Sequence, residues 1–145
     1  LDIGIDVAPV IPTTTEQAAS LLDKHHLVIM GGTTPGHTTD AVAVAFARDA
    51  GAGHCIIATN VSHVFDKDPR EHDDAQSFSS MTFDQLAEIT GIGEALSPGA
   101  SAVIDPIAVG WAQKAAITLA VLDGRDMLLL EQALDGKPFE GTLIQ

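Results

Sequence analysis

The chain has 145 residues, of which 46% are hydrophobic, and its 20 Asp and Glu residues against 7 Lys and Arg residues give a formal net charge of −13. This acidity excludes nucleic acid and anionic membranes as partners, because both carry negative charge. There is no apolar stretch of bilayer length and no visible signal peptide, so we expect a cytoplasmic protein.

The length and the composition predict one α/β domain over residues 1–145. The lone Cys55 lies in an apolar run and is expected in the core. The acidity suits a salt-adapted surface, and it suits an ordinary acidic cytosolic protein equally well.

The first half of the chain predicts two helices and two strands. Thr14 to His25 reads as a helix, capped either by Thr13 with Glu16 or by Thr14 with Gln17. The apolar run Leu27 to Met30 reads as a buried strand. A largely buried helix from Thr39 to about Ala50 follows, and His54 to Thr59 reads as the second buried strand.

The second half begins with a long polar segment, Asn60 to Ser80, which we interpret as a functional or mobile loop. The remaining expected elements are a helix capped by Thr82 and Gln85 that ends at Gly91, a glycine- and serine-rich stretch from Gly93 to Ser101, a helix from Val103 to about Ala115 with Pro106 in its first turn, a strand from Ile117 to Leu122, a helix from about Asp126 to Leu134, and a strand from Thr142 to Ile144.

The alternation of apolar strands with helices predicts a three-layer sandwich with a largely parallel sheet. Ligands of such sheets bind beyond the carboxyl ends of the strands. The loops Gly31 to Thr39, Asn60 to Asp68 and Asp123-Gly124 each follow a predicted strand, so we expect them at one edge.

The segment from Leu27 to Asp40 has the order strand, glycine turn, helix N-terminus, which suits an anion site. Gly31 and Gly32 allow close backbone approach, and the threonines that follow add hydroxyl donors. An ordinary strand-to-helix turn explains the local pattern equally well. Asp105, before Pro106, is by itself as compatible with a helix cap as with a catalytic group.

Five segments together resemble the amino-acid kinase superfamily, and within it the archaeal type of uridylate (UMP) kinase. They are MGGTTPGHTTDAVA (30–43), ATNVSHVFDKDP (58–69), SAVIDPIA (101–108), VLDGRD (121–126) and GTLI (141–144), with a weaker match at DIGID (2–6). The resemblance implies the carbamate kinase-like fold, of which this chain holds mainly the C-terminal, nucleotide-binding part, and transfer of the ATP γ-phosphoryl group to UMP in pyrimidine nucleotide synthesis.

The resemblance also implies roles for single residues. The residues matched to UMP binding are Gly32, Thr33, Thr34, Pro35, Gly36, His37 and Thr38, and those matched to ATP binding are Thr59, Asn60, Phe65 and Asp68. Asp105 matches an aspartate near the transferred phosphate. ATP and Mg²⁺ are the expected cofactors, and the assembly is expected to be a hexamer. Asp66, Asp68, Asp73 and Asp74 could gather Mg²⁺, although a solvated acidic loop explains Asp73 and Asp74 better.

Two positions depart from the family pattern. Ser62-His63 stands where the family usually has Asp-Gly, and Gly110 stands where relatives have lysine. The family's N-terminal phosphate loop is not seen, so we expect the fold to be incomplete. Two other functions stay open: another superfamily member that phosphorylates a carboxylate or carbamate, and a non-catalytic nucleotide- or anion-binding module.

Overall fold

The computed structural model of the chain describes residues 4–90 and 104–145. The expectations placed on Gly91, on Gly93 to Ser101 and on Val103 lie outside these described residues.

The core of the fold is a four-stranded sheet with the strand order β1-β5-β6-β4. The bounds are β1 (His54–Thr59), β4 (Ser80–Met81), β5 (Thr118–Asp123) and β6 (Thr142–Ile144). β1 pairs with β5 and β4 with β6 in parallel, whereas β5 and β6 run antiparallel. The register aligns Thr59, the last residue of β1, with Asp123, the last residue of β5. The expected largely parallel sheet is thus confirmed.

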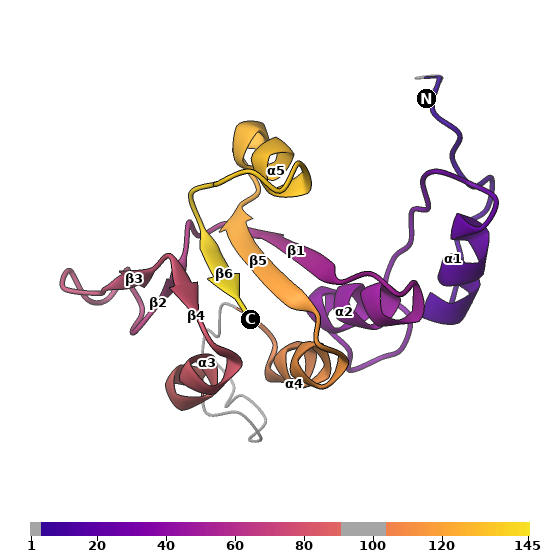
Figure 1. Cartoon of the computed structure of the whole chain (residues 1–145). Coiled ribbons are helices and arrows are strands. Elements are labelled where there is room, and N and C mark those ends of the chain that lie inside the picture. The colour runs from indigo at the N-terminus through magenta and orange to yellow at the C-terminus, as the bar shows by residue number, and fades with distance from the viewer. Residues whose placement is uncertain (1–3, 91–103) are drawn as a thin grey trace.

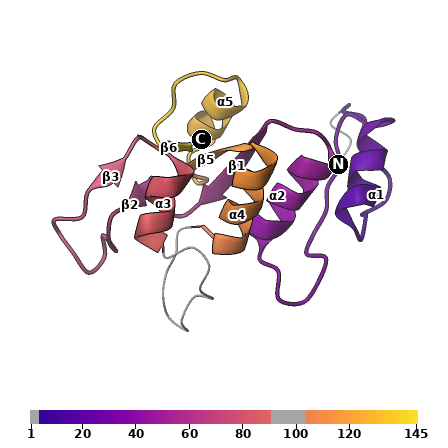
Figure 2. The same cartoon turned by 60° about the horizontal axis from the view of Figure 1, so that its bottom comes forward.

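Helices cover both faces of this sheet and make three layers. They are α1 (Thr15–Leu22), α2 (Thr39–Asp49), α3 (Phe83–Thr90), α4 (Pro106–Ala115) and α5 (Met127–Leu134). Figures 1 and 2 show α2, α4 and α3 side by side on one face and α5 alone on the other, with α1 against the outer side of α2. No helix among the described residues is long and apolar enough to cross a membrane.

Side chains at the helix starts fix these boundaries. Thr82 and Gln85 form a reciprocal capping box on α3: Gln85 N donates to Thr82 Oγ1 at 3.1 Å, and Thr82 N donates to Gln85 Oε1 at 2.9 Å. On α1, Thr14 Oγ1 accepts from Gln17 N at 3.2 Å as predicted, although the helix ends at Leu22 instead of His25. Asp105 caps α4 and Pro106 opens it.

The core lies between the sheet and the helices α2, α3 and α4. Small side chains let α2 and α4 approach closely, because Ala41, Ala45, Ala108 and Ala112 are all buried at this junction. Cys55 lies in the same core, as expected.

The predicted strand at Leu27 to Met30 is wrong. This run forms a single bridge, from Leu27 to Val7, and the Ile29 side chain is 58% exposed. The run lies along α2, where Val28, Met30 and Phe46 line a shared cavity of about 390 Å³. A strand needs a partner strand for its backbone groups, and among the described residues only this bridge pairs with the run.

The prediction of one continuous loop from Asn60 to Ser80 is also wrong. Strands β2 (Val64–Phe65) and β3 (Ser77–Phe78) pair there as an antiparallel hairpin, and β4 begins at Ser80. The buried Thr142 of β6 attaches this hairpin to the sheet, since Val64 N donates to its hydroxyl at 2.9 Å and that hydroxyl donates to Phe78 O. Val64 belongs to the hydrophobic core, and Phe78 packs against it.

Candidate active site at the carboxyl edge of the sheet

The edge beyond the carboxyl ends of β1 and β5 brings together the loops that follow these strands. Gly124 N donates to Thr59 O at 2.8 Å, and the Arg125 guanidinium donates to Asn60 O at 3.2 Å. A Cβ placed on Gly124 would lie 2.9 Å from Ala58 Cβ, so only glycine fits here without a shift of the backbone. Of the three loops expected at one edge, these two meet there, and the third, Gly31 to Thr39, does not follow a strand of the sheet.

Helices α2 and α4 begin at this edge, because each runs antiparallel to the strand that follows it (Figure 2). Their first turns are joined: Thr38 Oγ1 donates to Asp105 Oδ2 at 2.5 Å. The Thr38 hydroxyl also accepts from Ala41 N at 3.2 Å and so caps α2. The loop from Gly31 to Thr38 is thereby fixed at its end to the N-cap of α4.

Asp105 is held from several sides. Its Oδ1 accepts from Ile107 N at 2.9 Å, and its own N–H donates to Asp40 Oδ2 at 3.3 Å. Burial raises the pKa of the half-buried Asp40 carboxyl; the hydrogen bond from Asp105 N lowers it, and the nearby Asp105 carboxylate raises it. Asp40 belongs to this cluster but is not among the predicted site residues, although its place in the first turn after a threonine cap is visible in the sequence.

The Asp40 carboxylate also affects the buried Cys55 thiol. Burial raises the pKa of the Cys55 thiol to about 11, and the Asp40 carboxylate contributes to that rise. Cys55 is therefore a thiol at neutral pH, which fits a core residue and not a nucleophile.

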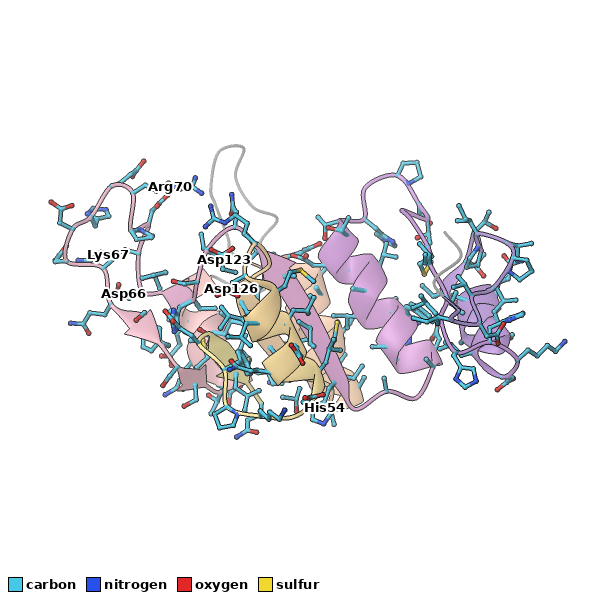
Figure 3. All side chains as sticks on the ribbon, turned by 90° about the horizontal axis from the view of Figure 1, so that it is seen from above. His54, Asp66, Lys67, Arg70, Asp123 and Asp126 are labelled. Atoms are coloured by element: carbon cyan, nitrogen blue, oxygen red, sulfur yellow. The ribbon has the colours of Figure 1, made fainter. Side chains whose placement is uncertain are left out.

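The residues matched to ATP binding are split between the strand end and the hairpin. Thr59 and Asn60 lie at the end of β1, whereas Phe65 lies in β2 and Asp68 in the turn beyond it. Asp68 Oδ1 accepts from Arg70 N at 2.8 Å, and its carbonyl accepts from His72 N at 3.0 Å. Figure 3 shows Asp66, Lys67 and Arg70 on this hairpin, which projects from the sheet.

One ion pair lies within the hairpin and another within the loop after β5. Lys67 Nζ lies 2.6 Å from Asp74 Oδ2, and Asp66 Oδ1 accepts from Gln76 N at 2.8 Å. The Arg125 guanidinium hydrogen-bonds Asp123 and holds the pKa of that carboxyl at about 2. Within residues 4–90 and 104–145, no group of three or more His, Cys, Asp or Glu side chains is placed to hold a metal ion.

The loop from Gly31 to Thr38 lines a cavity of about 260 Å³ through Thr33, Thr34 and His37. The start of α1, Arg48 of α2 and Trp111 of α4 form its other walls. The His37 and Trp111 rings meet edge to face, with centroids 5.5 Å apart.

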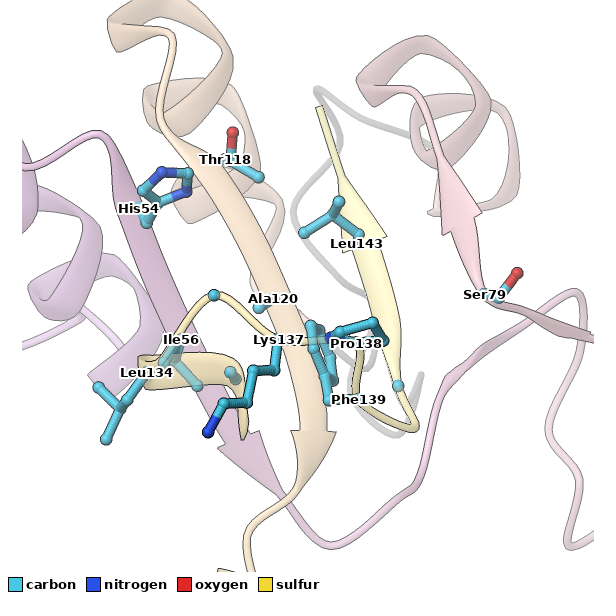
Figure 4. Close-up of a pocket in the computed structure, with 13 residues that line it drawn as sticks. His54, Ile56, Ser79, Thr118, Ala120, Leu134, Lys137, Pro138, Phe139 and Leu143 are labelled. Carbon is cyan, nitrogen blue, oxygen red and sulfur yellow. The ribbon is translucent and has the colours of Figure 1, made fainter. Parts of the chain in front are cut away.

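A larger cavity, of about 730 Å³, lies between α5 and the sheet (Figure 4). Its lining includes His54 and Thr118, the first residues of β1 and β5. Figure 3 shows His54 far from Asp123 and Asp126, at the opposite end of the strands. Because sheets of this kind bind ligands at the carboxyl ends of their strands, we place the candidate site at the other edge despite the smaller cavity there.

Comparisons with known proteins agree with this geometry. A sequence model of the "Amino acid kinase family" matches residues 1–123. The chain is 40% identical over 134 residues to a uridylate kinase of Methanococcus aeolicus and 37% identical over 135 residues to that of Methanocaldococcus jannaschii. These alignments cover 92% and 93% of this chain and 58% of each relative, so the chain spans about 58% of their length.

Among solved structures, the uridylate kinase of Archaeoglobus fulgidus superposes with a TM-score of 0.83 at 32% sequence identity. The superposition covers 97% of this chain and 62% of that one. The fold described above therefore corresponds to about three fifths of a uridylate kinase chain.

Proposed function

The chain belongs to the amino acid kinase family, and from that premise we propose that it is the nucleotide-binding part of a UMP kinase. The proposed reaction transfers the γ-phosphoryl group of ATP to UMP and yields UDP for pyrimidine nucleotide synthesis. Two relatives named uridylate kinase, 37% and 40% identical to this chain, support the proposal. We treat residues 1–145 as one α/β domain, mainly the C-terminal part of that fold.

One observation in the structure carries the proposal: the hydrogen bond between Thr38 and Asp105. It joins the glycine- and threonine-rich loop to the aspartate that the resemblance places near the transferred phosphate. The acceptor phosphate and the reacting centre would then share one edge of the sheet. This is the arrangement that in-line phosphoryl transfer requires.

The proposed acceptor site consists of Gly32, Thr33, Thr34, Pro35, Gly36, His37 and Thr38. The N-terminal dipole of α2, exposed backbone N–H groups and threonine hydroxyls would stabilise the UMP phosphate. Asp105 is the proposed catalytic residue, and its bond to Thr38 would set the position of that hydroxyl at the reacting centre. Asp40 would hold the Asp105 backbone in place through its 3.3 Å hydrogen bond.

The proposed donor site consists of Thr59, Asn60, Phe65 and Asp68. The Phe65 ring, which is half-buried, offers an apolar surface for adenine, and Asp68 offers carboxylate oxygens to a ribose or base donor. Magnesium would enter with ATP as part of the substrate and neutralise charge on its phosphates.

The test is phosphoryl transfer by the full-length gene product from Mg-ATP to UMP, CMP and acetylglutamate, in high potassium chloride. We expect transfer to UMP alone. Transfer to acetylglutamate instead would assign the chain to another branch of the superfamily. If no acceptor reacts while UMP or ATP still raises the melting temperature, the protein is a binding module and the kinase proposal is wrong.

The binding-module alternative is favoured by one feature, Gly110 of α4, at a position where the family resemblance implies a lysine. Gly110→Lys restores that cation, and a Cβ at this position meets nothing within 4 Å. If the wild type transfers no phosphoryl group and Gly110→Lys does, the result would support a binding module that has lost kinase activity. We further propose a homo-hexamer in the cytoplasm, which sedimentation of the full-length protein would test.

A further inference from the structure

Trp111 of α4 stands between two side chains from other elements. It is the only tryptophan of the chain, which has no tyrosine. The His37 ring contacts it edge to face, and the Arg48 guanidinium carbon lies 5.9 Å from the centre of its ring. Both are favourable geometries for an indole face.

Arg48 is itself fixed by its neighbours. Its guanidinium lies 2.8 Å from Asp49 Oδ1, and the other oxygen of that carboxylate accepts from the Thr15 hydroxyl at 2.6 Å. Trp111 is therefore held by a small network that links α1, α2 and α4. A ring held in this way is a rigid surface for a third group.

The loop from Gly31 to His37 has few anchors of its own. Its residues are exposed apart from the half-buried Thr33, and its one backbone hydrogen bond to a described residue runs from His37 N to Thr34 O at 3.2 Å. Among the described residues, the His37 side chain interacts with Trp111 alone. Thr33, Thr34, His37 and Trp111 line the same cavity.

We propose that Trp111 is a positioning residue for the UMP site: its ring holds the His37 imidazole and so sets where the loop presents its backbone N–H groups and hydroxyls to UMP. The residue acts through His37 and does not itself contact the substrate. This inference rests on the proposed function, because it takes the loop as the acceptor site.

The test is a double-mutant cycle on the full-length protein, with UMP affinity measured by calorimetry. Trp111→Leu removes the aromatic face, and we expect UMP binding to weaken about two- to tenfold, the range of one aromatic contact. Trp111→Phe keeps an aromatic face and should restore most of the affinity. In a His37→Ala background, Trp111→Leu should weaken binding no further. Lys114→Ala, an exposed change on α4, is the matched control.

A spectroscopic measurement checks the contact without substrate. The ring current of Trp111 should displace the proton resonances of the His37 imidazole in the wild type, and Trp111→Leu should abolish the displacement. Absence of that displacement in the wild type, or equal weakening of UMP binding by Trp111→Leu in both backgrounds, overturns the proposal. A wild type that binds UMP without transferring phosphate overturns only the kinase activity, because the cycle still decides the role of Trp111.

Discussion

Replacing Thr142 by valine tests how the β2–β3 hairpin is attached to the sheet. The side chain is fully buried, and its hydroxyl is bonded both to Val64 N and to Phe78 O. Valine has nearly the same shape, so the change creates no cavity but leaves a buried N–H and a carbonyl without their partner. An unsatisfied buried group costs about 1–3 kcal/mol, so we expect Thr142→Val to lower the free energy of unfolding by about 2–4 kcal/mol.

The assay is urea unfolding followed by Trp111 fluorescence and by circular dichroism. Thr142→Ser is the matched control, because it keeps the hydroxyl and loses one methyl group, which should lower the free energy of unfolding by about 1 kcal/mol. Hydrogen exchange at the Val64 amide should also become faster in Thr142→Val than in Thr142→Ser. The reasoning is refuted if Thr142→Val unfolds within about 0.5 kcal/mol of the wild type, or if serine is as destabilising as valine.

Four further outcomes follow from the structure. Gly110→Ala should raise the free energy of unfolding by about 0.5–1 kcal/mol in urea, because the residue lies inside α4 and its Cβ would meet nothing within 4 Å; no gain would contradict the described helix. The pKa of Asp40 is raised on folding, so its contribution to stability is present below its unfolded pKa and is lost as pH rises through the folded one. Relative to Asp40→Asn, the wild type should therefore lose stability in urea as pH rises above about 4, the ordinary pKa of Asp, and a constant difference would count against this. Cys55 should resist iodoacetamide near neutral pH in the native state and react in urea, since the thiol is buried and its pKa is about 11; rapid native labelling would place it outside the core. Raising potassium chloride from about 0.1 M to about 1 M should raise the urea midpoint of unfolding. The Debye length falls from about 10 Å to about 3 Å, so the negative side chains behind the net charge of −13 repel one another less. An unchanged midpoint would exclude charge repulsion as a significant contribution to stability.

The parts of the fold that the sequence predicts well depend on local signals. The β1 strand has its expected bounds, and the capping pair Thr82 and Gln85 forms as expected, because the apolar pattern and the cap lie within a few residues of each other. The helix expected from Val103 begins at Pro106, so the expected start is too early, whereas Pro106 does lie in the first turn and the end at Ala115 is as expected. The periodicity and capping rules are sufficient in such cases.

The errors arise where the partner is distant in the chain. Leu27 to Met30 has the composition of a strand, but composition does not show whether another strand lies beside it. The hairpin at Val64 and Phe78 depends on Thr142, 78 residues after Val64, so no local window contains the bond that attaches it. In the candidate site, Thr38 and Asp105 are separated by 67 residues, and only the fold shows that they touch.

The close contact of Gly124 with Ala58 has a consequence for engineering the protein. The loop after β1 and the loop after β5 share the bond from Gly124 N to Thr59 O and the bond from Arg125 to Asn60 O. In a library that randomises one loop and leaves the other unchanged, most variants will have a backbone that no longer fits against the unchanged loop. If the proposed function holds, changes of nucleotide preference should be sought in paired libraries that vary both loops together and retain glycine at 124.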